Sequence, residues 1–128
     1  MWSFDESDLT VWDRGIWSIP NVKSNHVEKT FHPCQFPIAL VDRFVLSLTP
    51  KNGVVFDPFA GVASAGVAAI LHNRRFCGCE IDEYYVEEGA KRINDALSGN
   101  ARYRSFDKPL YDHTRSSLSK EPKRHASG

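Results

Sequence analysis

Residues 54–71 read VVFDPFAGVASAGVAAIL. They begin with a short apolar run that ends in Asp57, and they close with small apolar residues. A bend rich in glycine and alanine lies between the two parts, and glycine allows a chain to turn sharply and approach a ligand closely. This pattern predicts a β-strand over 54–57, a tight turn, and a helix over 64–73 whose small side chains allow close packing on a sheet.

The sequence on either side extends this pattern. Apolar residues spaced by three and four predict a helix over 37–49, a second strand is expected over 74–82, and a further helix over 83–97. Strands that alternate with helices predict an α/β fold, with parallel strands, right-handed crossovers and flanking helices. Ligands of such folds bind beyond the carboxyl ends of the strands, where residues 57–66 and Glu80 are expected.

The composition restricts the class of protein. A length of 128 residues predicts one domain at most, and 41% hydrophobic with 25% charged residues is typical of a soluble globular chain. No apolar run approaches the about 20 residues of a membrane span, and the amino terminus lacks the pattern of a signal peptide. Three cysteines without CxxC spacing argue against a disulfide framework. We therefore expect a cytoplasmic protein with no membrane partner.

The formal net charge is zero but unevenly distributed. Residues 1–13 carry four acids and no base, whereas residues 99–128 carry seven bases and three acids. A basic tail either steers the protein toward nucleic acid or is a solvated segment, and its last part has the composition of a disordered chain. We predict an arm over 1–30, a ligand-binding half-domain over 31–98 and a basic, partly disordered tail over 99–128.

The bend lacks the known phosphate-binding patterns. It reads Gly61-Val-Ala-Ser-Ala-Gly66, which is not GxGxxG, and no Lys-Ser or Lys-Thr follows Gly66. Glu80 follows Gly61 by 19 residues at the end of the next strand, where an acid can accept both hydroxyls of a ribose. These features favour an adenosine ligand without phosphate, of which S-adenosylmethionine is the common example. A purely structural turn with a surface glutamate is the alternative.

Three segments carry a resemblance to a known family. NVKSNHVEKTFHPCQFPIALVDRFV (21–45), GVVFDPFAGVASAG (53–66) and RRFCGCEIDEYYVEEGAKRI (74–93) resemble the carboxyl half of DNA methyltransferases that act on adenine N6 or cytosine N4. The similarity is to the class whose cofactor motifs follow the catalytic motif. It implies a partial Rossmann-like methyltransferase fold, S-adenosylmethionine as cofactor, DNA as a partner of the assembled enzyme, and a bacterial, archaeal or phage origin.

The resemblance also implies a set of cofactor-binding residues. They are His32, Pro33, Cys34, Gln35, Asp57, Phe59, Gly61, Glu80 and Ile81. The segment from His32 is expected near the methionine portion, Asp57 at the methionine ammonium, Glu80 at the ribose and Ile81 against the adenine. We expect no metal site, because His32 has no partner at ligand spacing. Cys77 and Cys79 are interpreted as small buried hydrophobic residues.

Two departures from the family bear on function. Ala63 stands where the family has the second loop glycine, so either the turn avoids a positive φ or cofactor affinity suffers. The family's catalytic motif, a polar residue followed by Pro-Pro and an aromatic, does not occur in this sequence. Asp57-Pro58-Phe59 lies where the cofactor loop belongs, so no catalytic residue is predicted.

Three explanations stay open. The chain is one subunit of a split methyltransferase that needs a complementary half, or a fragment of a longer enzyme, or a stand-alone S-adenosylmethionine-binding or regulatory module without methyl transfer. A small parallel sheet with an unpaired strand edge tends to pair with another chain. We therefore expect an oligomer, which in isolation is a homodimer formed through the 54–57 edge, the 37–49 helix or the tryptophan-bearing arm.

Overall fold

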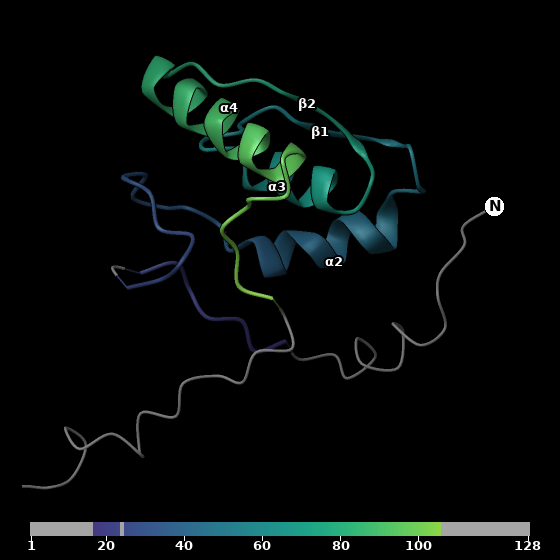
Figure 1. Ribbon diagram of the computed structural model, residues 1–128, viewed down its shortest axis with the longest axis horizontal. Helices are drawn as coiled ribbons and strands as arrows, with labels where there is room; N and C mark the ends of the chain where they lie inside the picture. Colours follow the sequence, from purple (N-terminus) through teal and green to yellow (C-terminus); the bar gives the residue numbers. More distant parts are fainter. Residues whose placement is uncertain (1–16, 24, 106–128) are drawn as a thin grey trace, which may run out of the picture.

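The computed structural model describes residues 17–23 and 25–105, and every structural statement below concerns these residues (Figure 1). Their order is helix, strand, helix, strand, helix, as the sequence predicts. The elements are α2 (Ile38–Leu48), β1 (Val54–Asp57), α3 (Ser64–Leu71), β2 (Arg75–Gly78) and α4 (Glu83–Leu97). Most of the tryptophan-bearing arm and most of the basic tail lie outside the described residues.

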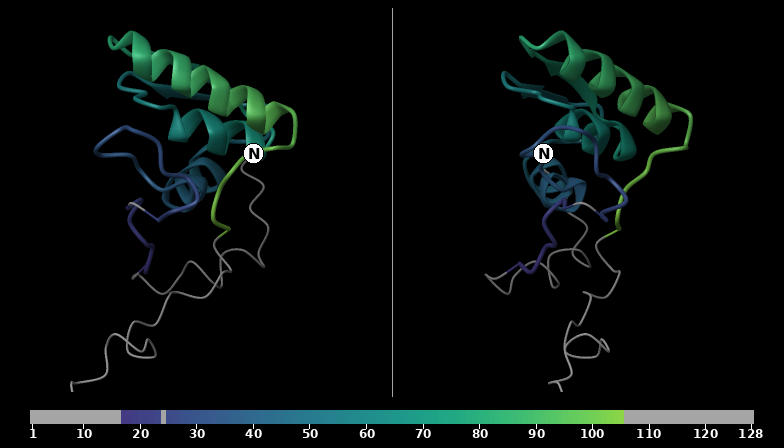
Figure 2. Two further views of the ribbon diagram at one scale, coloured as in Figure 1. Left: turned by 60° about the vertical axis from the view of Figure 1, so that its left-hand side comes forward. Right: turned by 90° about the vertical axis from the view of Figure 1, so that its left-hand side faces the viewer.

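The two strands of the described part form a parallel pair. Val54 lies opposite Arg75, and the register continues to Asp57 opposite Gly78. The crossover between them is α3, which contacts both strands and also α2 and α4 (Figure 2). The structure therefore confirms an α/β fold with parallel strands and flanking helices.

Small residues of α3 allow this central position. A Cβ atom added at Gly66 would lie 2.8 Å from Cδ1 of Phe76 on β2 and 2.9 Å from Cδ1 of Ile93 on α4. Because there is no room for a methyl group, glycine at this position permits β2 and α4 to approach the same turn of α3. The buried core continues from this contact through apolar residues of three helices: Ile38, Val45, Val67, Ala68 and Ala96.

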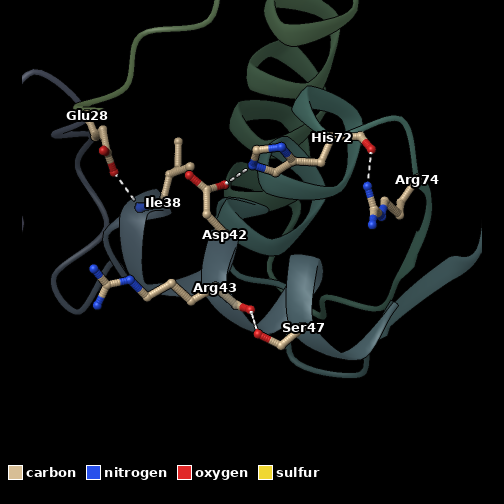
Figure 3. A network of polar contacts seen from close by, with 7 residues as sticks. All are labelled: Glu28, Ile38, Asp42, Arg43, Ser47, His72 and Arg74. Atoms are coloured by element: carbon tan, nitrogen blue, oxygen red, sulfur yellow. Dashed lines mark hydrogen bonds and ion pairs between the residues drawn. The ribbon is translucent and has the colours of Figure 1, made fainter. Parts of the chain in front are cut away.

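Polar contacts fix α2 at its start and on its flank (Figure 3). Buried Glu28 accepts hydrogen bonds from the backbone N–H of Ile38 at 2.9 Å and from that of Arg104 at 3.0 Å. Nε2 of His72, at the end of α3, lies 3.0 Å from Oδ1 of Asp42 on α2. One carboxylate near the amino terminus thus connects the start of α2 to the chain that follows α4.

The face of the sheet opposite α3 is open in the described part of the chain. Val54 is 50% exposed and Phe56 is 61% exposed. Cys77, which pairs with Phe56 across the sheet, and Cys79 are both exposed free thiols. The expectation that these cysteines are buried is therefore wrong, because no described element covers this face.

Candidate ligand-binding site

A cavity of about 320 Å³ lies beyond the carboxyl end of β1. Its walls come from the loop after β1, from the start of α3, and from the segment that leads into α2. Six of the nine predicted site residues line it: His32, Cys34, Gln35, Asp57, Phe59 and Gly61. The fold therefore brings together two motifs that stand more than 20 residues apart in the sequence.

The loop after β1 begins with a turn closed by Asp57. Its Oδ1 accepts a hydrogen bond from the backbone N–H of Phe59 at 3.0 Å. Backbone pairing continues past the strands, because Cys79 N donates to Asp57 O at 3.0 Å and Ala60 N donates to Cys79 O at 2.9 Å. The loop thus starts from a strand end held by backbone pairing, where Asp57 lines the cavity and Phe59 is 88% exposed.

Two residues of this loop adopt a left-handed conformation. Gly61 has a φ of 52° and Ala63 a φ of 56°. The turn therefore does not avoid a positive φ at Ala63, although this conformation costs an L-residue about 1–2 kcal/mol. Ala63 is nearly fully buried, and its methyl group would lie 3.1 Å from a Cβ added at Gly89 of α4. A glycine on the neighbouring helix makes the space for this alanine.

Glu80 connects the loop to the end of β2. Its Oε2 accepts from the N–H of Gly61 at 2.8 Å, and its Oε1 accepts from the N–H groups of Ile81 at 2.9 Å and Asp82 at 3.0 Å. The pKa of Glu80 is lowered from its ordinary value mainly because the carboxylate accepts the backbone hydrogen bonds from Asp82 and Gly61. A carboxylate has about four acceptor sites. Two ribose hydroxyls would therefore have to replace one of these backbone donors.

The segment before α2 is packed on the first turn of α4. The centroid of the Tyr85 ring lies 4.4 Å from the centroid of the His32 ring and 5.7 Å from that of the Phe31 ring. His32 Nδ1 accepts from the N–H of Cys34 at 3.1 Å, so the ring proton of neutral His32 lies on Nε2. Nε2 points at Gly61, where an added Cβ would lie 3.3 Å away. Tyr85, which the sequence analysis did not select, therefore supports this wall of the cavity.

Gln35 stabilises the same segment from inside. Its side-chain oxygen accepts from the N–H of Thr30 at 3.1 Å and from the Thr30 hydroxyl at 2.9 Å, and its amide N–H donates to Glu28 O at 2.7 Å. The residue is buried. These bonds use most of the donors and acceptors of the Gln35 side-chain amide. Gln35 therefore acts by fixing the shape of the segment before α2.

The last two predicted residues, Pro33 and Ile81, are exposed. Ile81 is 98% exposed, next to Glu80. Its apolar side chain is therefore free to contact a ligand beside Glu80, and its packing on an adenine stays a prediction. In the described residues no group of three His, Cys, Asp or Glu side chains is arranged to hold a metal ion, and no helix there has the length and apolar character of a membrane span.

Ser64 lines the cavity and Arg92 lies behind it, and neither residue was predicted from the sequence. The Ser64 hydroxyl donates to Phe36 O at 2.9 Å, and Arg92 donates to Val62 O. Arg92 occurs three residues after buried Gly89 and four before buried Ala96, so it lies on the buried face of α4. A buried cation needs hydrogen-bond acceptors. The position of Arg92 on this face could therefore have predicted from the sequence that it bonds to a neighbouring segment.

A parallel strand–loop–helix–strand unit with a cavity and an acid at its strand ends is the arrangement of an α/β protein that binds ligands beyond the carboxyl ends of its strands. The chain belongs to the N6/N4 methyltransferase family, described as DNA methylase, whose model matches residues 5–91. This membership agrees with the resemblance found in the three sequence motifs.

Similar proteins match over part of their length. The type II methyltransferase M.BglII of Bacillus subtilis is 43% identical over 72 residues, which cover 56% of this chain and 20% of that protein. The DNA adenine methyltransferase YhdJ of Escherichia coli (strain K12) is 37% identical over 81 residues, which cover 63% of this chain and 28% of that protein. The crystal structure of an M1.HpyAVI–SAM complex is similar with a TM-score of 0.50 and 28% identity, covering 62% of this chain and 44% of that one. The chain thus spans less than a third of these two curated relatives.

Proposed function

We propose that this chain is the S-adenosylmethionine-binding part of a DNA methyltransferase that acts on adenine N6 or cytosine N4. The observation that carries the proposal is the convergence of three motifs, HPCQ, DPFAG and EI, around and beside one cavity at the strand ends. The family of the chain and its similarity to a methyltransferase solved with its cofactor support the same ligand.

Each motif would hold one portion of the ligand. The segment from His32 lies near the methionine portion, and the Asp57 carboxylate accepts from the methionine ammonium. Glu80 accepts from the ribose, and Ile81 packs against the adenine. The cofactor supplies an electrophilic methyl group, and the residues of this chain bind and orient it.

Base recognition and activation would come from a complementary part. An exocyclic amine is a weak nucleophile, because its lone pair is delocalised into the ring, and the Pro-Pro-aromatic motif that serves it is absent from this sequence. We propose that a complementary half-methyltransferase supplies this motif and the DNA contacts. It is either another subunit or another portion of a longer chain, and the assembled enzyme acts on DNA in the bacterial, archaeal or phage-infected cytoplasm.

The open side of the sheet is the proposed docking surface for that half. Val54 and Phe56 expose apolar side chains there, and Cys77 lies beside them. An exposed apolar patch marks an interaction surface or causes aggregation. The edge of β1 away from β2 also has no paired strand in the described residues, so another chain can add one there. In isolation the chain would then form a homodimer that buries about 1,200–2,000 Å².

Calorimetry with S-adenosylhomocysteine tests the ligand. We expect the wild-type chain to bind, and Glu80→Ala to bind at least about tenfold more weakly, because a hydrogen bond to a charged group is lost. Glu83→Ala is the matched control, since Glu83 is an exposed acid on the adjoining turn of α4. Equal affinity of wild type and Glu80→Ala would rule out this role.

Methyl transfer distinguishes the enzyme from a stand-alone binding module. We expect no incorporation of tritiated methyl groups into DNA by the purified chain. Incorporation should appear on co-expression with a half that carries the Pro-Pro-aromatic motif. A chain that binds the cofactor but never supports transfer in such pairs would instead be a binding or regulatory module.

A further inference from the structure

A hydrogen-bonded chain links three walls of the cavity from behind. The Ser64 hydroxyl donates to the backbone carbonyl of Phe36 at 2.9 Å. The same hydroxyl lies 3.3 Å from Nη1 of Arg92, which also donates to the carbonyl of Val62. Ser64 is 7% exposed, so water does not readily replace these bonds.

The connected groups belong to separate segments. Phe36 ends the segment before α2, Val62 lies in the loop after β1, Ser64 begins α3, and Arg92 is on α4. The first three line the 320 Å³ cavity, whereas Arg92 stands behind them. Phe36 and Ser64 are 28 residues apart in sequence, so their bond sets the distance between two walls of the cavity.

We propose that Ser64 and Arg92 are positioning residues for the ligand, and that they hold the segment 32–36 against the loop after β1. This inference rests on the proposed function. In that proposal the segment 32–36 faces the amino-acid portion of the ligand, while Glu80 and Ile81 face the ribose and the adenine. Loss of the Ser64 hydroxyl should therefore weaken binding of the amino-acid portion and spare the nucleoside portion.

Two ligands separate these portions. S-adenosylhomocysteine carries the amino-acid group, and 5′-methylthioadenosine is the same nucleoside thioether without it. For Ser64→Ala we expect the affinity for S-adenosylhomocysteine to fall about fivefold to tenfold, the equivalent of one buried hydrogen bond. The affinity for 5′-methylthioadenosine should change less than about twofold.

Further variants separate positioning from folding. Ser64→Cys keeps nearly the same volume with a weak donor and should behave like Ser64→Ala. Arg92→Lys keeps the charge, but the lysine side chain ends one atom short of Nη1, the nitrogen that donates both to Val62 O and to the Ser64 hydroxyl. It should therefore discriminate between the ligands in the same direction. Ser98→Ala is the matched control, because its hydroxyl also donates to a carbonyl, at 2.8 Å, but at the far end of α4.

An equal loss of affinity for both ligands, or no loss for either, would overturn the inference and leave Ser64 with a role in stability alone. A wild-type chain that binds neither ligand would instead refute the proposed function. Hydrogen exchange then still tests the positioning. Ser64→Ala should speed amide exchange in residues 30–36 and leave residues 83–97 unchanged, and unchanged exchange in residues 30–36 would contradict it.

Discussion

The close contact between Ala63 and Gly89 leads to a double-mutant test. Ala63 holds a left-handed conformation at the start of α3, with φ 56° and ψ 43°. Gly89 lies on the buried face of α4, and a Cβ added there would be 3.1 Å from the Ala63 methyl group and 3.4 Å from the carbonyl carbon of Val62. The perturbation is to move the methyl group from one residue to the other, in the variant Ala63→Gly/Gly89→Ala.

The single changes carry opposing terms. Gly89→Ala gains about 1 kcal/mol of helix propensity but adds a methyl group to a full space, which costs about 1–3 kcal/mol. Ala63→Gly removes about 1–2 kcal/mol of backbone strain, loses about 0.8 kcal/mol of apolar burial, and adds up to about 1 kcal/mol of unfolded-state entropy. We therefore expect Gly89→Ala to be neutral or destabilising by up to about 2 kcal/mol, and Ala63→Gly to lie within about 1 kcal/mol of wild type.

The double variant keeps the gain in propensity and removes the contact. Its free energy of unfolding in urea should therefore equal or exceed that of wild type, with a coupling energy of at least about 1 kcal/mol. Ala90→Gly at the adjacent exposed position measures the propensity term alone and should cost about 1 kcal/mol. Single effects that add within about 0.5 kcal/mol would refute the contact as the reason for glycine at residue 89.

Three further outcomes follow from single features. Gly66→Ala should destabilise the chain by about 1–3 kcal/mol in urea unfolding, because its methyl group would overlap two packed side chains. The lowered pKa of Glu80 stabilises the fold above the ordinary glutamate range, and this stability is lost as the pH falls through the folded pKa. Glu80→Gln should therefore flatten the acid side of the stability profile. In light scattering at low micromolar concentration, Phe56→Lys on the open face should reduce self-association, and Leu97→Lys, at an equally exposed site on α4, should not. A well-folded wild-type monomer would contradict the docking surface.

The sequence was sufficient to predict the five described elements and their order. Their signals are local, since apolar spacing and the turn residues act over a few positions. The meeting of the loop over 57–66 with Glu80 was also predictable once the strands were expected to be parallel, whereas the HPCQ segment was placed beside them only by the family resemblance. The second strand was predicted over 74–82 but its ladder covers Arg75–Gly78, because the chain after it turns to bring Glu80 toward Gly61.

The missed features depend on contacts between distant residues. Nothing near Ser64 in the sequence indicates that its hydroxyl meets a carbonyl 28 residues earlier. The exposure of Cys77 and Cys79 was missed because an apolar strand looks the same whether its outer face is covered by its own chain or left for another. Side-chain networks and uncovered faces are properties of the assembled tertiary structure.

In the proposed function, Glu80 serves both ligand binding and folding. Its carboxylate accepts from the N–H of Gly61, so a bond within the chain itself shapes the loop. Binding then spends little free energy on ordering the loop, which favours affinity. A ribose that needs both carboxylate oxygens must displace a backbone donor, which opposes affinity. Because Ser64 fixes the other wall through Phe36 without sharing a hydrogen bond with Glu80, the cavity can keep its width while this exchange takes place.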